Sequence, residues 1–262
     1  MDKKEICKKI KKATKKIILL SNGKVVNTGT GVIIKNDGIL LTANHVVNNF
    51  KKIPNPRIFV IFTDETRGIV HMEYEIMLSD VTHDSNLQFI KPVEIDLAIL
   101  RPKQKIDLGD NYIELEKLEI EEGEDVIMAG FPDEIKLAFD FYSLLDFNNP
   151  ELAQKRTEIE NMLNLSMSLM MIKSGMIGAI HKINLNGKFC SKDVSIRGCS
   201  YWIDNASTYG ASGGALVNSN GKLIGIICQK GETALLSIPN IKIPSGSTMA
   251  LSHKLITWAL YL

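Results

Sequence analysis

Short apolar runs rich in β-branched residues recur along most of this chain, and turn residues separate them. Residues 36–38 (Asn-Asp-Gly) and 218–221 (Asn-Ser-Asn-Gly) have the residue chemistry of hairpin turns. Helical spacing is scarce between the runs, so the pattern favours an all-β fold of antiparallel barrels or a sandwich over parallel winding. The expected strands are 16–20, 29–35, 38–43, 58–62, 74–78, 97–101, 126–130, 176–183, 194–201, 215–218, 223–228 and 248–252.

Segments of a different character flank or interrupt these strands. Residues 2–16 have a capping-box start and isoleucines at helical spacing among lysines, which predicts a basic amphipathic helix. Such a helix either docks its apolar stripe on its own domain or contacts an anionic surface. Asn148-Asn149-Pro150 signals a helix start inside residues 133–170, and residues 253–262 predict a short closing helix.

The composition excludes several classes of protein. The net charge of +1 gives no field that would draw nucleic acid or a membrane surface, so neither is expected as a partner. No stretch approaches the roughly 18 apolar residues of a membrane span. The apolar run Ile17–Leu20 is short for a secretory signal, so we expect a cytoplasmic protein, or a mature form whose signal is not shown.

The cysteines and histidines predict neither a metal site nor a cofactor. The four cysteines lack metal-ligand spacing, and the five histidines are scattered. Free buried thiols are expected, with a Cys190–Cys199 bridge as the alternative in an oxidising compartment.

The stretch Gly210-Ala211-Ser212-Gly213-Gly214 indicates a nucleophilic serine, because glycines let backbone N–H groups approach what the serine attacks. A serine hydroxyl needs a histidine base and an acid that orients it. One assignment takes both partners from downstream, Glu232 and His253, as in α/β-hydrolases. Those intervals are too short for the strand–helix units between them, and the strand after Ser212 leads into a turn.

The other assignment takes both partners from upstream, in the order His, Asp, Ser. Leu41-Thr42-Ala43-Asn44-His45 is a strand running into a histidine, and Asp96 precedes the apolar run 97–100. Asp80 and Asp84 are weaker substitutes for Asp96. The remaining histidines are expected to be surface or packing residues: His71, His83, His181 and His253.

These segments resemble those of trypsin-like serine peptidases. Leu-Thr-Ala-Asn-His resembles their histidine segment, Asp-Leu-Ala-Ile-Leu their acid segment, and Gly-Ala-Ser-Gly-Gly-Ala-Leu-Val-Asn their serine segment. Residues 28–34, Ala-Gly-Phe-Pro at 129–132 and Asp-Asn-Ala at 204–206 are similar to the bacterial HtrA-like branch. The resemblance covers about residues 16–132 and 172–258.

The resemblance implies a single domain of two six-stranded antiparallel β-barrels with the active site between them. The expected parts are the basic helix 1–16, the N-terminal barrel 17–120, the C-terminal barrel 121–252 with its helical insert 133–170, and the C-terminal helix 253–262. The resemblance leaves the basic helix and the insert unmatched.

It also implies a serine endopeptidase acting on protein or peptide substrates. Ser212 would attack the peptide carbonyl, His45 would accept and return the proton, and Asp96 would orient His45. Backbone N–H groups of Gly210 and Ser212 would form the oxyanion hole. Substrate-binding residues are expected at Ala206, Cys228 and Gln229. The alternative is a trypsin-fold regulatory or binding protein that is inactive or gated by a partner.

The chain departs from the family at three places. Ala211 stands where an aspartate would pair with a newly cleaved N-terminus, so activation of that kind is not expected. The sequence ends soon after the second barrel, so we expect no PDZ domain. The insert 133–170 is the candidate contact for a regulatory protein partner, or else a helix packed on the barrel. Ala206 offers no charge for a basic side chain, so a small or aliphatic P1 residue is expected.

Overall fold

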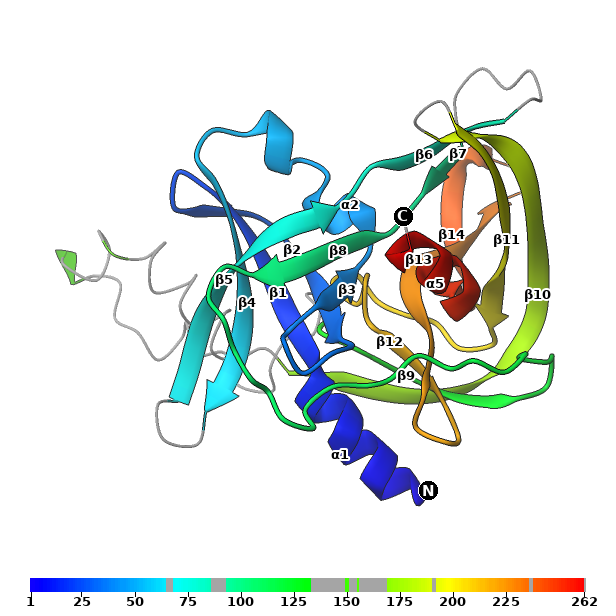
Figure 1. Ribbon diagram of the computed structural model, residues 1–262, viewed down its shortest axis with the longest axis horizontal. Coiled ribbons are helices and arrows are strands. Elements are labelled where there is room, and N and C mark those ends of the chain that lie inside the picture. The colour runs from blue at the N-terminus through cyan, green and yellow to red at the C-terminus, as the bar shows by residue number, and fades with distance from the viewer. Residues whose placement is uncertain are drawn as a thin grey trace.

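A computed structural model of the chain describes residues 1–64, 68–85, 93–132, 149–150, 155, 169–189, 192–235 and 238–261. Within these residues the strands close two antiparallel six-stranded β-barrels that lie side by side (Figure 1). The all-β fold expected from the strand pattern is therefore confirmed. The helical insert expected at 133–170 lies almost entirely outside the described residues.

The first barrel closes because its first strand pairs with both its second and its fourth strand. Its hydrogen-bonded order is β1-β2-β3-β8-β5-β4. Side chains such as Ile17, Leu40 and Val60 fill its interior with no exposed surface. The strands are β1 Thr14–Ser21, β2 Lys24–Ile33, β3 Leu40–Thr42, β4 Pro56–Asp64, β5 Gly68–Leu78 and β8 Ala98–Pro102.

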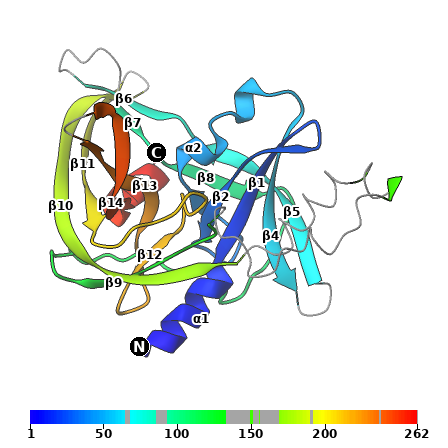
Figure 2. The same ribbon diagram turned by 180° about the vertical axis from the view of Figure 1, so that it is seen from behind.

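The second barrel has the order β11-β14-β13-β12-β9-β10 and closes where β10 pairs with β11. Figure 2 shows this barrel from behind, with the long β10–β11 hairpin curving around it. The strands are β9 Asp125–Gly130, β10 Met171–Phe189, β11 Lys192–Ile203, β12 Ala215–Asn218, β13 Leu223–Leu235 and β14 Ile238–Ser252.

A hairpin that the strand pattern does not predict joins the second sheet. Its strands, β6 Val81–Ser85 and β7 Val93–Ile95, come from the part of the chain between β5 and β8. Ser85 pairs with Gly187 of β10. The polar sequence Thr-His-Asp within β6 hides the alternation that would otherwise signal a strand.

The helices lie at the ends of the barrels. Helix α1 covers Lys3–Ala13 and ends earlier than expected, because Thr14 already pairs with Val32 in the first barrel. Its buried residues are Ile6, Ile10 and Ala13, so the apolar stripe docks on the chain's own core. Helix α5, His253–Leu260, packs against β11, β13 and β14 near the expected closing position. No helix in the described ranges is long and apolar enough to cross a membrane.

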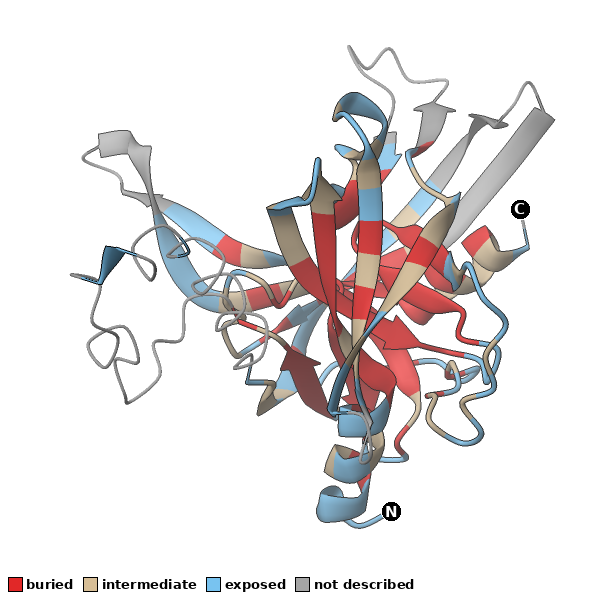
Figure 3. Ribbon diagram, turned by 90° about the vertical axis from the view of Figure 1, so that its left-hand side faces the viewer, coloured by how far each residue is buried: buried red, intermediate tan, exposed pale blue. Residues whose placement is uncertain are grey.

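The two barrels share one apolar core where they meet. Leu41 and Ile99 of the first barrel belong to the same buried cluster as Ala215 and Ile226 of the second. Figure 3 shows this continuous buried interior. Because β3 ends and β8 begins at this interface, the loops attached to them lie beside the loop that precedes β12.

Candidate active site

His45 lies in a single helical turn that directly follows β3. This turn, α2, covers Asn44–Val47 and begins after Ala43, whose backbone is extended. Asn44 is fully buried, and its side-chain amide donates to Glu94 Oε1 at 2.9 Å and to Asp80 Oδ1 at 3.2 Å. The buried amide fixes the turn, while the His45 side chain remains 45% exposed at the barrel interface.

Asp96 holds His45 at two points. Its Oδ1 accepts the His45 backbone N–H at 2.9 Å, and its Oδ2 lies 2.8 Å from His45 Nδ1. This contact favours the tautomer with hydrogen on Nδ1, which leaves Nε2 as an acceptor. Hydrogen bonding to Asp96 raises the pKa of His45, and its charge adds to that effect, although partial burial opposes them.

Asp80, one of the two other carboxylates considered for this role, does not take it. Asp80 accepts hydrogen bonds from Lys51, Asn44 and Ser79 instead. The side chain of Asp84 lies outside the described residues. Asp96 is therefore the carboxylate that the structure brings to His45.

Ser212 lies in the loop of residues 204–214, between β11 and β12. Residues 208–211 form a β-turn closed by Ala211 N–H donating to the Thr208 carbonyl at 3.2 Å. Gly210 has a φ of +83° at the third position, as a type II turn requires. Gly213, next to the serine, has a φ of +82°. The glycines of this motif are thus needed for backbone conformation.

Thr30 of β2 ties this loop to the first barrel. Its backbone N–H donates to the Ser212 carbonyl at 2.8 Å, and its hydroxyl donates to the Gly210 carbonyl at 2.7 Å. The same hydroxyl accepts Phe131 N–H at 2.9 Å. Thr30 is fully buried, so these bonds are shielded from water.

Gly213 brings the serine to the strand that leads into His45. A Cβ at Gly213 would lie 2.1 Å from the Thr30 carbonyl oxygen, 2.3 Å from Thr42 Oγ1 and 2.9 Å from Ala43 N. Only a residue without a side chain can approach so closely. The structure therefore brings Ser212 to the same interface as His45 and Asp96.

Hydrogen-bonding groups around Ser212 remain available for a ligand. Among the described residues, no acceptor contacts the N–H groups of Gly210 and Ser212. Within the same residues the Ser212 hydroxyl makes no hydrogen bond, to His45 or to any other group. Backbone N–H donors, a serine hydroxyl and an oriented imidazole at one barrel interface are the kinds of group that acyl transfer needs.

The three candidate substrate-binding residues lie in different environments. Cys228 is buried, and its thiol donates to the Asp96 carbonyl oxygen at 3.6 Å. Burial raises the pKa of this thiol. Gln229 is exposed on β13, and Ala206 is half-buried with its carbonyl bonded to Lys173. Cys228 thus contacts the acid of the site, and substrate binding by the three residues stays a prediction.

The downstream assignment of Glu232 and His253 is wrong, because the chain forms barrels with no strand–elbow–helix unit at Ser212 in the described residues. His253 is buried at the start of α5, with its Nδ1 3.2 Å from Tyr201 Oη and 3.3 Å from the Ile224 carbonyl oxygen. Burial lowers the pKa of His253, as expected of a packing residue. His71 and His181 are exposed, as expected of surface residues, and the side chain of His83 lies outside the described residues.

Cys7, Cys199 and Cys228 are free thiols, and Cys190 lies outside the described residues. In the described part of the chain, no group of three His, Cys, Asp or Glu side chains gathers as metal ligands would.

Comparison with known proteins places this site within a recognised family. The family model of the trypsin-like peptidase domain matches residues 29–226, a range that runs from β2 into β13 and includes His45, Asp96 and Ser212. No curated protein matches the chain.

Proposed function

The chain belongs to the trypsin-like peptidase family, and we propose that it is a serine endopeptidase with the triad His45, Asp96 and Ser212. The observation that carries this proposal is the two-point contact between the Asp96 carboxylate and His45. That contact holds the imidazole in one orientation and one tautomer, at the interface where Ser212 also lies. An oriented base beside a serine is what nucleophilic attack at neutral pH requires.

In the first step, Ser212 Oγ attacks the carbonyl carbon of the scissile peptide while His45 Nε2 takes its proton. The resulting imidazolium is stabilised by the Asp96 carboxylate. The tetrahedral intermediate then collapses: the C–N bond breaks, and His45 gives the proton to the leaving amine. An acyl-enzyme ester on Ser212 remains.

In the second step, a water molecule attacks the ester carbonyl carbon while His45 Nε2 takes a proton from that water. The bond to Ser212 Oγ then breaks, His45 returns the proton to Oγ, and the acid product leaves. In both steps the negatively charged oxygen of the tetrahedral intermediate accepts hydrogen bonds from the backbone N–H groups of Gly210 and Ser212. Removing one such donor costs about 100- to 1,000-fold in kcat in enzymes where this has been measured.

The substrates we propose are proteins or peptides, with a small or aliphatic residue before the scissile bond because Ala206 carries no charge. The insert 133–170 is the proposed contact for a regulatory partner.

A partner-gated regulatory protein is the second candidate. The unengaged Ser212 hydroxyl favours it, since a resting enzyme can hold its nucleophile away from the base until a partner binds. In unliganded enzymes, however, catalytic hydrogen bonds are often long or poorly aligned and tighten on substrate binding.

Labelling with a fluorophosphonate probe separates the two candidates. We expect the wild type to react and Ser212→Ala to be silent, while Ser219→Ala, an exposed serine in the β12–β13 turn, reacts like the wild type. His45→Ala should also be silent, with His71→Ala as the exposed control. A wild type that neither labels nor cleaves casein, alone or with added cell extract, would refute the endopeptidase.

A further inference from the structure

Lys173 of β10 reaches the loop that carries the nucleophile. Its ammonium donates to the Ala206 carbonyl oxygen at 2.7 Å. In the described part of the chain, this ammonium forms no ion pair with a carboxylate. The side chain is therefore committed to the loop rather than to a surface ion pair.

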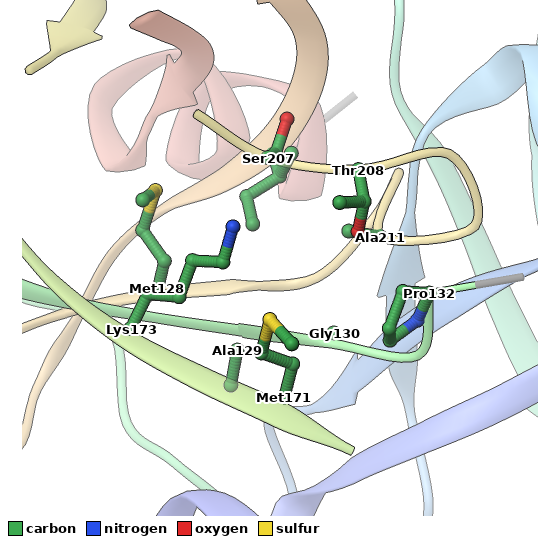
Figure 4. A pocket seen from close by; sticks show the side chains of 10 residues that line it. Met128, Ala129, Gly130, Pro132, Met171, Lys173, Ser207, Thr208 and Ala211 are labelled. Carbon is green, nitrogen blue, oxygen red and sulfur yellow. The ribbon is translucent and has the colours of Figure 1, made fainter. Parts of the chain in front are cut away.

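Among the described residues, Lys173 is the only charged one that lines a small pocket beneath this loop. The pocket opens to solvent, and the space in it, open solvent included, is about 250 Å³. Figure 4 shows the Lys173 side chain lying beneath the loop segment that carries Ser207 and Thr208. The rest of the lining is apolar or small, including Met128, Met171, Ala211 and Ile227. A charge-assisted hydrogen bond is stronger in such surroundings than in water.

The bond fixes one particular peptide group. The Ala206 carbonyl accepts from Lys173, and the N–H of the same peptide, on Ser207, donates to Thr248 Oγ1 at 2.6 Å. Side chains from β10 and β14 thus hold opposite edges of one peptide plane. The next residue, Thr208, begins the type II turn that ends at Ala211.

The rest of the loop has anchors on either side of this peptide. Before it, Asp204 and Asn205 bond to the backbone of β10 at Met176 and Ser174. After it, Thr30 holds Gly210 and Ser212. Lys173 is thus the charged anchor at the entry to the turn. Ala211 is buried and has no polar side chain that could hold the turn from below.

We propose that Lys173 is a positioning residue for the oxyanion hole: by holding the Ala206–Ser207 peptide, its ammonium sets the turn that presents the N–H groups of Gly210 and Ser212. The inference rests on the proposed function for its catalytic consequence. The conformational consequence for the loop does not depend on catalysis.

The test compares Lys173→Met, which keeps the length but not the charge, with Lys173→Arg and with Lys182→Met. Lys182 is an exposed lysine of the same strand and serves as the matched control. We expect Lys173→Met to lower kcat for a peptide substrate about tenfold or more, a smaller loss than the roughly 100- to 1,000-fold of a removed oxyanion donor, because the donors are displaced and not removed. KM should change little, Lys173→Arg should recover part of kcat, and Lys182→Met should match the wild type.

Chemical rescue adds a readout that a merely structural role would not move. Lys173→Ala removes the equivalent of n-propylammonium from the pocket. Added n-propylammonium should restore kcat toward the wild-type value, whereas the uncharged isostere 1-propanol should not. Equal rescue by both, or by neither, would overturn the role of the ammonium.

Hydrogen exchange of residues 204–214, followed by mass spectrometry, tests the inference without activity. Exchange in Lys173→Met should be about tenfold faster than in the wild type, as expected for a loop that opens more often. Unchanged exchange in this segment overturns the proposal whatever the activity. Faster exchange in an enzyme that the fluorophosphonate probe never labels would support the anchor and refute only the proposed peptidase function.

Discussion

Gly213→Ala is the substitution that should damage the site most for its size. Gly213 adopts a left-handed backbone with a φ of +82°, which costs a residue with a side chain about 1–2 kcal/mol. The added methyl would also lie 2.1 Å from the Thr30 carbonyl oxygen and 2.9 Å from Ala43 N. These are backbone atoms of β2 and of the residue that directly follows β3, so they cannot move aside as a flexible side chain would.

Gly246→Ala provides a matched control for the backbone cost. Gly246 also has a φ of +82°, but nothing lies within 4 Å of its added methyl. Gly246→Ala should therefore lower the free energy of unfolding only by the backbone cost that both substitutions share. Overpacking typically adds about 1–3 kcal/mol at a crowded position. For a chain of this size, that corresponds to a further fall in Tm of about 2–12 °C for Gly213→Ala relative to Gly246→Ala.

The same clash should separate Ser212 from the strand that leads to His45. A displacement of about 1 Å at a reacting group can cost about 100-fold in rate. We therefore expect fluorophosphonate labelling of Gly213→Ala to slow by about that factor, and labelling of Gly246→Ala to match the wild type. Thermal unfolding and labelling rates measured on both variants decide the matter. Equal Tm values and equal labelling rates in the two variants would refute the reasoning.

Three other predictions concern the base, the barrel contact and the buried thiol. Because Asp96 raises the pKa of His45 above its ordinary 6.5, kcat/KM should fall with acid at a midpoint above pH 6.5, and Asp96→Asn should move that midpoint down. The contact between His45 and Asp96 should stabilise the fold below pH 6.5, and this contribution should be lost as the pH rises through the raised pKa of His45. Urea unfolding measured as a function of pH would show the loss. Thr30→Val leaves the Gly210 carbonyl without its hydrogen bond and should lower the free energy of unfolding in urea by about 2 kcal/mol or more, whereas Thr30→Ser should lower it by about 1 kcal/mol. Burial and the raised pKa should slow iodoacetamide alkylation of Cys228 in the native protein about 100-fold relative to the protein in urea, as mass spectrometry can follow.

Local sequence patterns were sufficient to predict most of the strands. Alternation and turn chemistry located residues 215–218 and 223–228, which lie in β12 and β13. Gly221 in the turn between them has a φ of +73°, as the hairpin signal requires. Strand bounds were less accurate. β10 extends from Met171 to Phe189, well beyond the predicted 176–183, because its first residues pair with β9 and its pairing with β11 continues to Phe189.

Residue chemistry and chain order predicted the members of the site, but not what holds them. The contact of His45 with Asp96 could be predicted because each residue lies next to a recognisable strand in its own sequence motif. Thr30 and Gly210 are 180 residues apart, and nothing local to either indicates that a hydroxyl of one serves the carbonyl of the other. Likewise, nothing in the sequence around Lys173 indicates that its side chain contacts the loop that carries Ser212. Such partners become visible only when the barrels are placed in contact.

The position of Ser212 relative to His45 is therefore a property of the barrel interface. The histidine turn is fixed within the first barrel by Asn44, and the entry to the serine loop is fixed within the second by Lys173 and Thr248. Thr30, the close contact of Gly213 and the bond from the Cys228 thiol to the Asp96 carbonyl connect the two. Each barrel can stay folded while these contacts loosen, because each has its own interior cluster of buried side chains. Substitutions at the interface should thus reduce catalysis more steeply than stability, and substitutions inside either barrel should do the reverse.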